Sequence, residues 1–306
     1  MEVKSVIASK IVRKLLFSVG CFKINTGKDI SPVFIVGAGR SGNTLLRKIL
    51  CGSRDLYIPP ETYVLGSCVA DFERYSFLGW PTVCRIVLSR FAFSPDFDTF
   101  PNPLLGGLYQ KLCSAPEQEK SCAHIIDSFY KYMAETAKPS AVRWGDKTPH
   151  NVFHLESIDS VFPKAQYIHI IRNGYDVVAS YMKMGRYDDP ADAAERWATA
   201  IRKCRDFGRD RVSRYTEVRY ETLVAAPYEV TASLCDFLGL RYSPDILDKP
   251  PAPEELGDVD RREHYGSVMK PITGDSIGKG RKSLKDEEIA RIEPIIAPLM
   301  KDLGYV

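Results

Sequence analysis

PVFIVGAGRSGNTLL, residues 32–46, is the stretch that decides the fold of this chain. Five residues typical of a buried strand run into a glycine-rich turn, and an amphipathic helix follows. Gly37, Gly39 and Gly42 let the backbone turn tightly and approach a ligand closely. Free N–H groups at the start of the helix, together with the guanidinium of Arg40, suit a phosphate or a sulfate. The stretch therefore predicts an anion site at a strand–turn–helix junction.

This turn differs from a Walker A loop, which has Gly-Lys-Ser/Thr four residues after its first glycine. The segment 40–44, RSGNT, has no lysine at that place, so the expected anion is not a Mg-bound triphosphate. A purely structural turn in an ordinary α/β protein is the alternative interpretation of the same pattern.

The composition of the 306-residue chain is that of an ordinary globular protein, with 44% hydrophobic and 26% charged residues. A net charge of +3 is too small to imply nucleic-acid binding. The eight cysteines form no Cys-x-x-Cys pair and none lies near a histidine at metal spacing. We therefore expect reduced thiols, no metal site and a cytoplasmic location.

Residues 1–30 have a pattern of their own. Basic residues interrupt the apolar ones, so no run approaches the ~20 residues needed to span a bilayer, and no signal-peptide layout is present. Apolar residues recur there at helical spacing: Ile7, Ile11, Leu15 and Val19. This pattern predicts an amphipathic extension that docks on the protein, with weak peripheral membrane contact through residues 1–23 as the alternative. Residues 31–306 are expected to form a single domain.

Beyond the first strand, short apolar segments alternate with helical stretches. The expected strands are 33–37, 56–59, 141–145, 167–171 and 216–220. The expected helices are 43–51, 63–92, 121–137, 151–161, 174–185, 191–209, 227–238 and 285–303, while 94–120 and 249–266 are expected to be irregular. This alternation predicts an α/β, P-loop-type three-layer fold with a mainly parallel sheet of about five strands. Ligands of such sheets bind beyond the carboxyl ends of the strands.

A second anion site is predicted by YIHIIRNGYDVVAS, residues 167–180. Arg172 ends a buried strand, and Ser180 lies on the helix that follows. Their guanidinium and hydroxyl groups can converge on one phosphate. A P-loop NTPase would have an aspartate at the strand end to hold Mg²⁺, so the arginine favours a second bare anion.

With these two sites, the chain resembles the sulfotransferases that use 3′-phosphoadenosine 5′-phosphosulfate (PAPS), especially their bacterial and tyrosylprotein branch. Three further segments resemble family motifs in the family's order: WGDKTP at 144–149, RYETL at 219–223 and IGKGR at 277–281. The resemblance covers roughly residues 32 to 305. It implies in-line transfer of a sulfuryl group from PAPS to an acceptor hydroxyl, with adenosine 3′,5′-bisphosphate (PAP) as the product and no metal.

The resemblance also implies which residues bind the donor. The first loop would bind the phosphosulfate through Gly39, Arg40, Ser41, Gly42, Asn43 and Thr44. The remaining donor contacts would be Arg172 and Ser180 on the 3′-phosphate, Tyr220 near the adenine, and Lys279 and Arg281 in a loop that closes over the nucleotide. Asn43 departs from the threonine or serine usual in the family, which predicts altered donor affinity rather than lost binding.

Catalysis would rest on charge stabilisation and a base. Arg40 and Lys147 are expected to stabilise the transferring group and the leaving oxygen. Glu61, directly after the second strand, matches the glutamate base of the tyrosylprotein and heparan branches, and His150 is the alternative base. The structural alternatives are a surface ion pair between Lys147 and Asp146, and a helix N-terminal acid for Glu61.

The acceptor is expected to contact the least regular segments, 61–120, 183–195 and 243–268. Family analogy favours a carbohydrate or glycolipid hydroxyl, while protein tyrosine and a small-molecule alcohol stay open. Two other functions fit part of the pattern: a P-loop nucleotide kinase or phosphotransferase, and a binding protein that kept the fold without the chemistry. The sequence predicts no oligomeric state.

Overall fold

The computed structural model describes residues 22–258 and 270–305. At its centre is a five-stranded sheet in the order β2-β3-β1-β4-β5, and every strand pair is parallel. The strands are β1 (Val33–Val36), β2 (Leu56–Tyr57), β3 (Arg143–Lys147), β4 (Gln166–Ile171) and β5 (Tyr215–Arg219). The predicted parallel sheet of about five strands is confirmed. Most of the predicted amphipathic extension, residues 1–21, lies outside the described residues.

The middle strand β1 explains why the opening stretch decides the fold. All four of its residues are apolar and fully buried, as a strand covered on both faces requires. Phe34 and Val36 pack on one layer of helices, and Val33 and Ile35 pack on the other. In the register, Val33 lies opposite Gly145 of β3 and Gln166 of β4.

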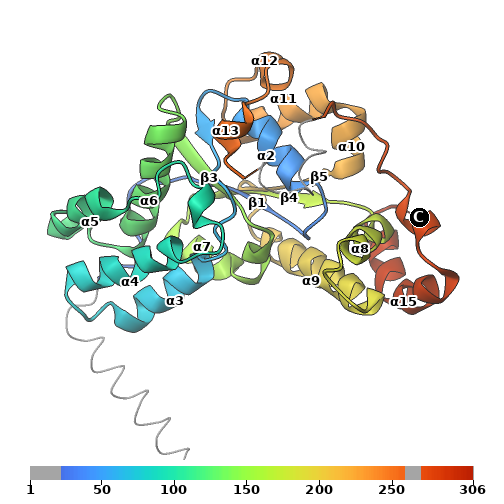
Figure 1. Cartoon of the computed structure of the whole chain (residues 1–306), viewed down its shortest axis with the longest axis horizontal. Coiled ribbons are helices and arrows are strands. Elements are labelled where there is room, and N and C mark those ends of the chain that lie inside the picture. The colour runs from blue at the N-terminus through green and yellow to red at the C-terminus, as the bar shows by residue number, and fades with distance from the viewer. Residues whose placement is uncertain (1–21, 259–269, 306) are drawn as a thin grey trace, which may run out of the picture.

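Helices cover both faces of the sheet and make the three layers visible in Figure 1. One layer holds α2 (Asn43–Cys51), α10 (Tyr220–Ala225), α11 (Pro227–Leu238), α12 (Asp245–Asp248) and α13 (Pro253–Leu256). The other holds α3 (Leu65–Tyr75), α4 (Trp80–Ala92), α5 (Gly106–Cys113), α6 (Cys122–Ala137), α7 (Leu155–Val161), α8 (Gly174–Lys183), α9 (Pro190–Gly208) and α15 (Asp286–Asp302). Short turns complete the chain: η1 (Phe97–Thr99), η2 (Glu117–Glu119), η3 (Pro149–Phe153) and α14 (Gly280–Ser283).

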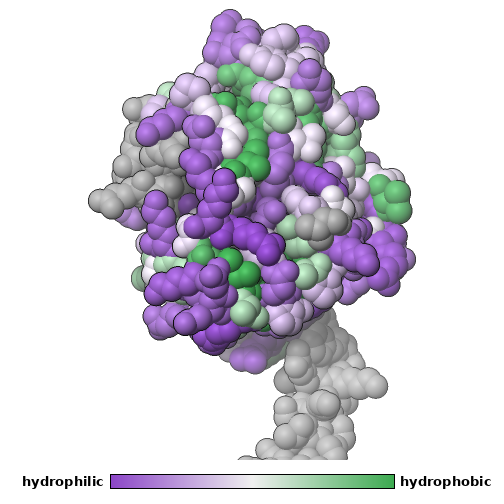
Figure 2. Space-filling view, turned by 90° about the vertical axis from the view of Figure 1, so that its right-hand side faces the viewer, coloured by the Kyte–Doolittle hydropathy of each residue, from purple (hydrophilic) through white to green (hydrophobic). Residues whose placement is uncertain are grey.

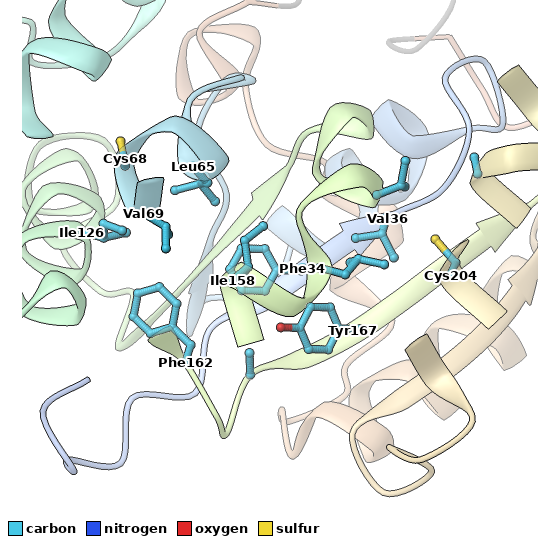
Figure 3. Packing of buried hydrophobic residues seen from close by; sticks show 14 of the residues in the cluster. Phe34, Val36, Leu65, Cys68, Val69, Ile126, Ile158, Phe162, Tyr167 and Cys204 are labelled. Carbon is cyan, nitrogen blue, oxygen red and sulfur yellow. The ribbon is translucent and has the colours of Figure 1, made fainter. Parts of the chain in front are cut away.

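Aromatic side chains fill the larger layer. Phe34 of β1 stacks on Tyr167 of β4 with ring centroids 5.4 Å apart, and Phe162 packs beside them (Figure 3). Trp197 is fully buried, and its indole N–H donates to the carbonyl of Arg172 (3.1 Å). Polar and charged side chains cover most of the face on which α8 and α15 lie (Figure 2). Within the described residues, no helix has the length and apolar character to cross a bilayer.

Four predicted element boundaries were wrong in ways that matter for the site. The predicted helix 63–92 is two helices, because the backbone at Gly79 is extended and α4 begins at Trp80, with Pro81 in its first turn. The stretch predicted as irregular, 94–120, contains α5. The third strand runs on to Lys147, so this lysine ends a strand instead of lying in the following loop. Tyr220 begins α10 rather than ending a strand.

Candidate active site

The glycine-rich turn after β1 has the backbone that its sequence predicts. Arg40 and Gly42 have positive φ values of 67° and 98°. A side chain at Gly42 would collide with the ring of Tyr220, so the turn can pack there only as glycine. Helix α2 begins next, and no side chain caps it, which leaves its first N–H groups to a ligand. The Asn43 amide donates to the carbonyl of Ala38 (2.7 Å) and thus braces the turn.

Two buried polar atoms mark where an anion would fit. Among the described residues, the hydroxyl of Ser41 and the Nε of Arg172 are buried without a hydrogen-bond partner. An unsatisfied buried donor is costly, and an oxyanion bound at each of the two predicted anion sites would satisfy these groups. The donor set therefore fits the phosphate and sulfate groups of PAPS.

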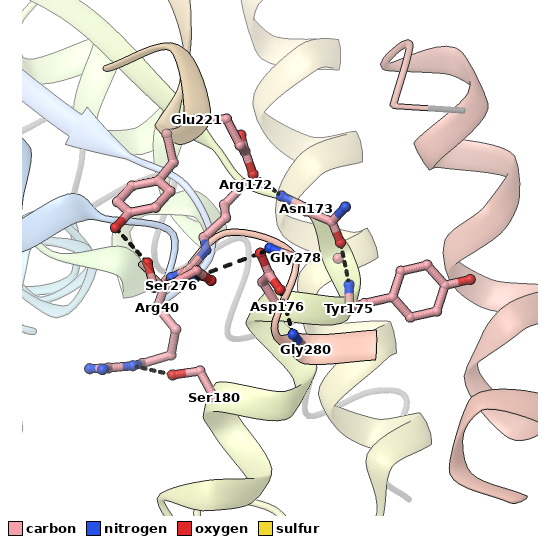
Figure 4. Close-up of polar contacts among 12 residues, drawn as sticks. Arg40, Arg172, Asn173, Tyr175, Asp176, Ser180, Glu221, Ser276, Gly278 and Gly280 are labelled. Carbon is pink, nitrogen blue, oxygen red and sulfur yellow. Dashed lines mark hydrogen bonds and ion pairs between the residues drawn. The ribbon is translucent and has the colours of Figure 1, made fainter. Parts of the chain in front are cut away.

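The structure brings the two predicted anion sites together, as Figure 4 shows. The Nε of Arg40 donates to the hydroxyl of Ser180 (3.1 Å), and Arg172 donates to the carbonyl of Arg40 (3.2 Å). The Arg172 guanidinium also lies 4.4 Å from the centre of the Tyr220 ring. Four residues predicted to bind the sulfuryl donor thus form one continuous surface: Arg40, Arg172, Ser180 and Tyr220.

A loop from the C-terminal region covers this surface. Arg172 donates to the carbonyl of Ser276 (2.7 Å), whose hydroxyl lies 2.8 Å from that of Tyr220. The carboxylate of Asp176 accepts the backbone N–H groups of Gly278 (2.9 Å) and Gly280 (2.7 Å). Sequence reasoning missed Ser276 and Asp176. An acid four residues after Arg172, in the first turn of the helix that follows it, was a signal for Asp176, while Ser276 had none.

The two predicted basic residues of this loop take different places. The Lys279 side chain is exposed on the loop. The guanidinium of Arg281 lies 4.9 Å from the centre of the Tyr175 ring, and Tyr175 points away from Arg40 and Ser180 (Figure 4). The loop therefore lies where the sequence predicts, but in this conformation Arg281 does not face the other donor residues.

A buried acid–lysine pair lies next to the donor loop. Lys147 at the end of β3 is fully buried and forms an ion pair with the carboxylate of Glu61. Its Nζ is also 3.3 Å from the hydroxyl of Thr44 at the start of α2. Tyr63 donates a second hydrogen bond to Glu61. Lys147 thus links the donor loop to the candidate base.

Both structural alternatives for these residues were wrong. Asp146 does not pair with Lys147; its buried carboxylate accepts from Tyr130 (2.6 Å) and Thr62 (3.1 Å), and from Asn151 (2.7 Å). Glu61 is no helix N-terminal acid, because α3 begins only at Leu65.

The pKa values of the two buried carboxyl groups, Glu61 and Asp146, are shifted in opposite directions. Burial acts to raise the pKa of Glu61, but the charge and hydrogen bond of Lys147 and the Tyr63 hydroxyl outweigh it. The pKa of Glu61 therefore lies below its usual value, and the group is a carboxylate at neutral pH. The pKa of Asp146 is raised, since burial outweighs the hydrogen bonds that it accepts. The difference arises because only Glu61 has a cation at contact distance.

A second buried ion pair holds the segment before Glu61 and was not predicted. Arg47 of α2 is fully buried and donates to Asp258 (2.6 Å) and to the carbonyls of Ile58 (2.9 Å) and Leu256 (2.5 Å). Burial acts to lower the pKa of Arg47, but the charge and hydrogen bond of Asp258, together with Cys51 and Tyr57, raise it above its usual value. The stretch 249–266 was expected to be irregular, but its residue Asp258 is buried and holds Arg47 in place through this ion pair. An arginine in an amphipathic helix and an aspartate in a loop carried no signal of this pairing.

The alternative base has a different setting. His150 is exposed on η3, and its ring lies 5.2 Å from that of His154 and 5.5 Å from that of Phe153. His169 is buried, and its Nδ1 lies 2.6 Å from the hydroxyl of Tyr215, as expected for a core histidine. The described residues hold no group of three or more His, Cys, Asp or Glu side chains that could bind a metal ion.

Comparison with known proteins gives a consistent family. A model of the "Sulfotransferase family" matches residues 32–244. Protein-tyrosine sulfotransferase 1 of Danio rerio is 23% identical over 91% of this chain and 73% of its own length. The omega-hydroxy-beta-dihydromenaquinone-9 sulfotransferase Stf3 of Mycobacterium tuberculosis is 24% identical over 87% and 79%.

Solved structures agree on the fold. The sulfotransferase domain of the Synechococcus PCC 7002 olefin synthase matches with a TM-score of 0.58 and 24% identity, over 89% of this chain and 98% of that domain. The sulfotransferase domain from the curacin biosynthetic pathway matches with a TM-score of 0.56 and 21% identity, over 87% and 96%.

Proposed function

Because this chain belongs to the sulfotransferase family, and so is an enzyme that takes its sulfuryl group from PAPS, we propose that Lys147 and Glu61 form its catalytic centre and that its acceptor is a hydroxyl group. The observation that carries this proposal is the position of Lys147. Its ammonium lies between the hydroxyl of Thr44 in the donor loop and the carboxylate of Glu61. A cation there can stabilise the negative charge on the leaving phosphate oxygen, while the Glu61 carboxylate beside it takes the proton of the acceptor hydroxyl.

The donor would be held by the surface around the glycine-rich turn. Arg40, Ser41 and the first N–H groups of α2 suit the phosphosulfate, and Arg172 with Ser180 suits the 3′-phosphate. PAPS supplies an activated sulfuryl group, whose bond to the phosphate oxygen breaks as the acceptor oxygen bonds to sulfur. The positive charges of Arg40 and Lys147 offset the charge that develops on that phosphate oxygen.

The Glu61–Lys147 ion pair allows the pKa of Glu61, and so its strength as a base, to rise during the reaction. Against Lys147, the pKa of Glu61 lies below its usual value, which makes it a weak base. As Lys147 turns toward the growing negative charge on the leaving oxygen, Glu61 loses the cation that lowers its pKa. Burial then raises that pKa and favours transfer of the acceptor proton to the Glu61 carboxylate. Proton transfer would thus follow the charge movement of the sulfuryl transfer.

The acceptor is proposed at the level of class. We favour a carbohydrate or glycolipid hydroxyl by family analogy. The names of two relatives supply the other candidates, a protein tyrosine and a hydroxylated dihydromenaquinone. Transfer of labelled sulfate from PAPS into fractionated cell extract would identify the acceptor, because the label stays on the product.

Two variants test the two halves of the proposal. Arg172→Ala should weaken PAP binding in calorimetry, and unchanged affinity would remove Arg172 from the donor site. Glu61→Gln should lower turnover of the labelled donor with little change in PAP affinity. Full activity of this variant would make His150 or another group the base.

A further inference from the structure

Four basic side chains surround Phe153, just after the strand that ends in Lys147. They come from η3, from the residue that follows it and from α9. The guanidinium of Arg196 lies 4.0 Å from the centre of the Phe153 ring, and the ammonium of Lys203 lies 5.7 Å from it. The rings of His150 and His154 lie 5.2 Å apart, and His150 is 5.5 Å from Phe153. We call these five residues the Phe153 cluster.

Among the residues that the structure describes, no acidic group forms an ion pair with the four basic side chains of the Phe153 cluster. Burial, the neighbouring His154 and Arg196 lower the pKa of His150, and burial and Lys203 lower that of His154. No carboxylate opposes either shift in the part of the chain that the structure describes. The acid nearest in sequence to Arg196, Glu195, pairs with Arg202 instead (3.8 Å). Gathering like charges without a counter-charge is unfavourable unless a ligand supplies one.

The Phe153 cluster lies beside the reaction centre. Strand β3 ends at Lys147, and η3, which carries His150 and is followed directly by His154, begins at Pro149. On the other side, burial raises the pKa of Tyr181 to about 12, and the positive charges of Arg196 and Arg40 act against this rise. Both guanidinium groups therefore lie near the Tyr181 ring. The Tyr181 hydroxyl packs against the donor loop, since a Cβ at Gly39 would lie 2.6 Å from it. The cluster therefore lies at the carboxyl edge of the sheet, and Tyr181 lies between it and the donor loop.

We propose that the Phe153 cluster binds an oxyanion, a phosphate or carboxylate group, on the acceptor, so that the enzyme selects acceptors that carry such a group beside the reacting hydroxyl. This inference rests on the proposed function. Arg196 supplies a fork of donors suited to an oxyanion, and each imidazole can add one more when protonated. The Phe153 ring covers one side of the charges, which strengthens their attraction for a bound anion. The donor phosphates have their own partners at Arg40 and Arg172, so this anion would be a separate one.

Histidine NMR on the intact chain tests the inference with inorganic phosphate as the probe. The protein is first saturated with PAP, so that phosphate cannot occupy the donor site, and the ionic strength is kept constant with sodium chloride. Phosphate should shift the ring signals of His150 and His154 to saturation and raise the pKa of both, because an anion favours the charged imidazole. A parallel titration with acetate asks which oxyanion the cluster takes. A response to phosphate alone supports a phosphate ester, and a response to acetate supports a carboxylate.

A matched pair of variants on α9 completes the test. Arg196→Gln should weaken phosphate binding about tenfold, as expected for loss of one charged hydrogen-bond partner. Arg202→Gln removes an exposed arginine that pairs with Glu195 on the same helix and should leave the affinity unchanged. Imidazole signals that do not move in either titration, or equal losses in the two variants, would overturn the inference. Calorimetry with PAP on separate, PAP-free samples keeps the tests distinct: failure to bind PAP contradicts the donor site, and a loss of phosphate affinity in Arg196→Gln but not in Arg202→Gln then still locates the anion at the Phe153 cluster.

Discussion

The proposed donor surface (Arg40, Arg172, Ser180 and Tyr220) and the proposed reaction centre (Glu61 and Lys147) share one edge of the sheet but are assembled differently. Each anion site of the donor surface comes from one strand–turn–helix segment, 37–44 or 172–180. In the reaction centre, Glu61 and Lys147 are 86 residues apart in sequence, and Arg47 and Asp258 hold the chain before Glu61 across 211 residues. Anion binding needs backbone N–H groups and one arginine, which a short segment can supply. A fixed acid–lysine pair needs supports from across the fold.

The largest effect should follow from removing the lysine of the reaction centre. Lys147→Met takes away the cation that would offset charge on the leaving oxygen, so turnover should fall about 10³-fold, on the order of 4 kcal/mol in the barrier. PAP affinity should change far less, because Arg40 and Arg172 remain. Single-turnover transfer from labelled PAPS measures the first quantity and calorimetry the second. Lys183→Met, at the exposed end of α8, is the control. A loss below tenfold would show that Lys147 is only structural.

A smaller effect, on the free energy of unfolding, should follow from breaking the long-range ion pair between Arg47 and Asp258. Asp258→Asn leaves the fully buried Arg47 without its counter-charge and should lower the free energy of unfolding by about 3 kcal/mol in urea titrations. The double variant Arg47→Met with Asp258→Leu should recover most of this loss, because a buried apolar pair needs no counter-charge. Loss of less than about 1 kcal/mol in the single variant would mean that water already reaches the pair.

The same contrast explains what the sequence could predict. The five strands and the glycine-rich turn after β1 follow from hydrophobic runs and glycines close together in the chain, and the two anion sites were predicted from the same short segments. The contact of Ser180 with Arg40 was not predicted, because the sequence assigned Ser180 to the same phosphate as Arg172. The Glu61–Lys147 contact was not predicted as a contact, although both residues were identified, because each lies at the end of a different strand. Arg47 was missed for a physical reason: a buried arginine on an amphipathic helix looks like a solvated one until its distant partners are known.

An intermediate effect should come from the one long-range element of the donor surface. Asp176 accepts two backbone N–H groups of the covering loop, and an asparagine offers only one oxygen to them. Asp176→Asn should therefore release the loop and weaken PAP binding about tenfold. Calorimetry measures this, with Asp192→Asn on the exposed face of α9 as the control. Equal affinity for the two variants would show that the loop takes no part in binding PAP.

The smallest effect is a pH dependence that reports directly on the acid of the reaction centre. Lys147 holds the folded-state pKa of Glu61 below its usual value, so the pair stabilises the fold at pH values above the unfolded pKa of about 4.3. This contribution is lost as the pH falls through the lower, folded-state pKa. The difference in unfolding free energy between the wild type and Glu61→Gln should thus be constant near neutral pH and shrink in acid. A difference that grows as the pH falls would require a raised pKa. With a raised pKa, Glu61 would be protonated at pH values closer to 7. A protonated carboxyl group cannot accept the proton of the acceptor hydroxyl, so Glu61 could not act as the base there.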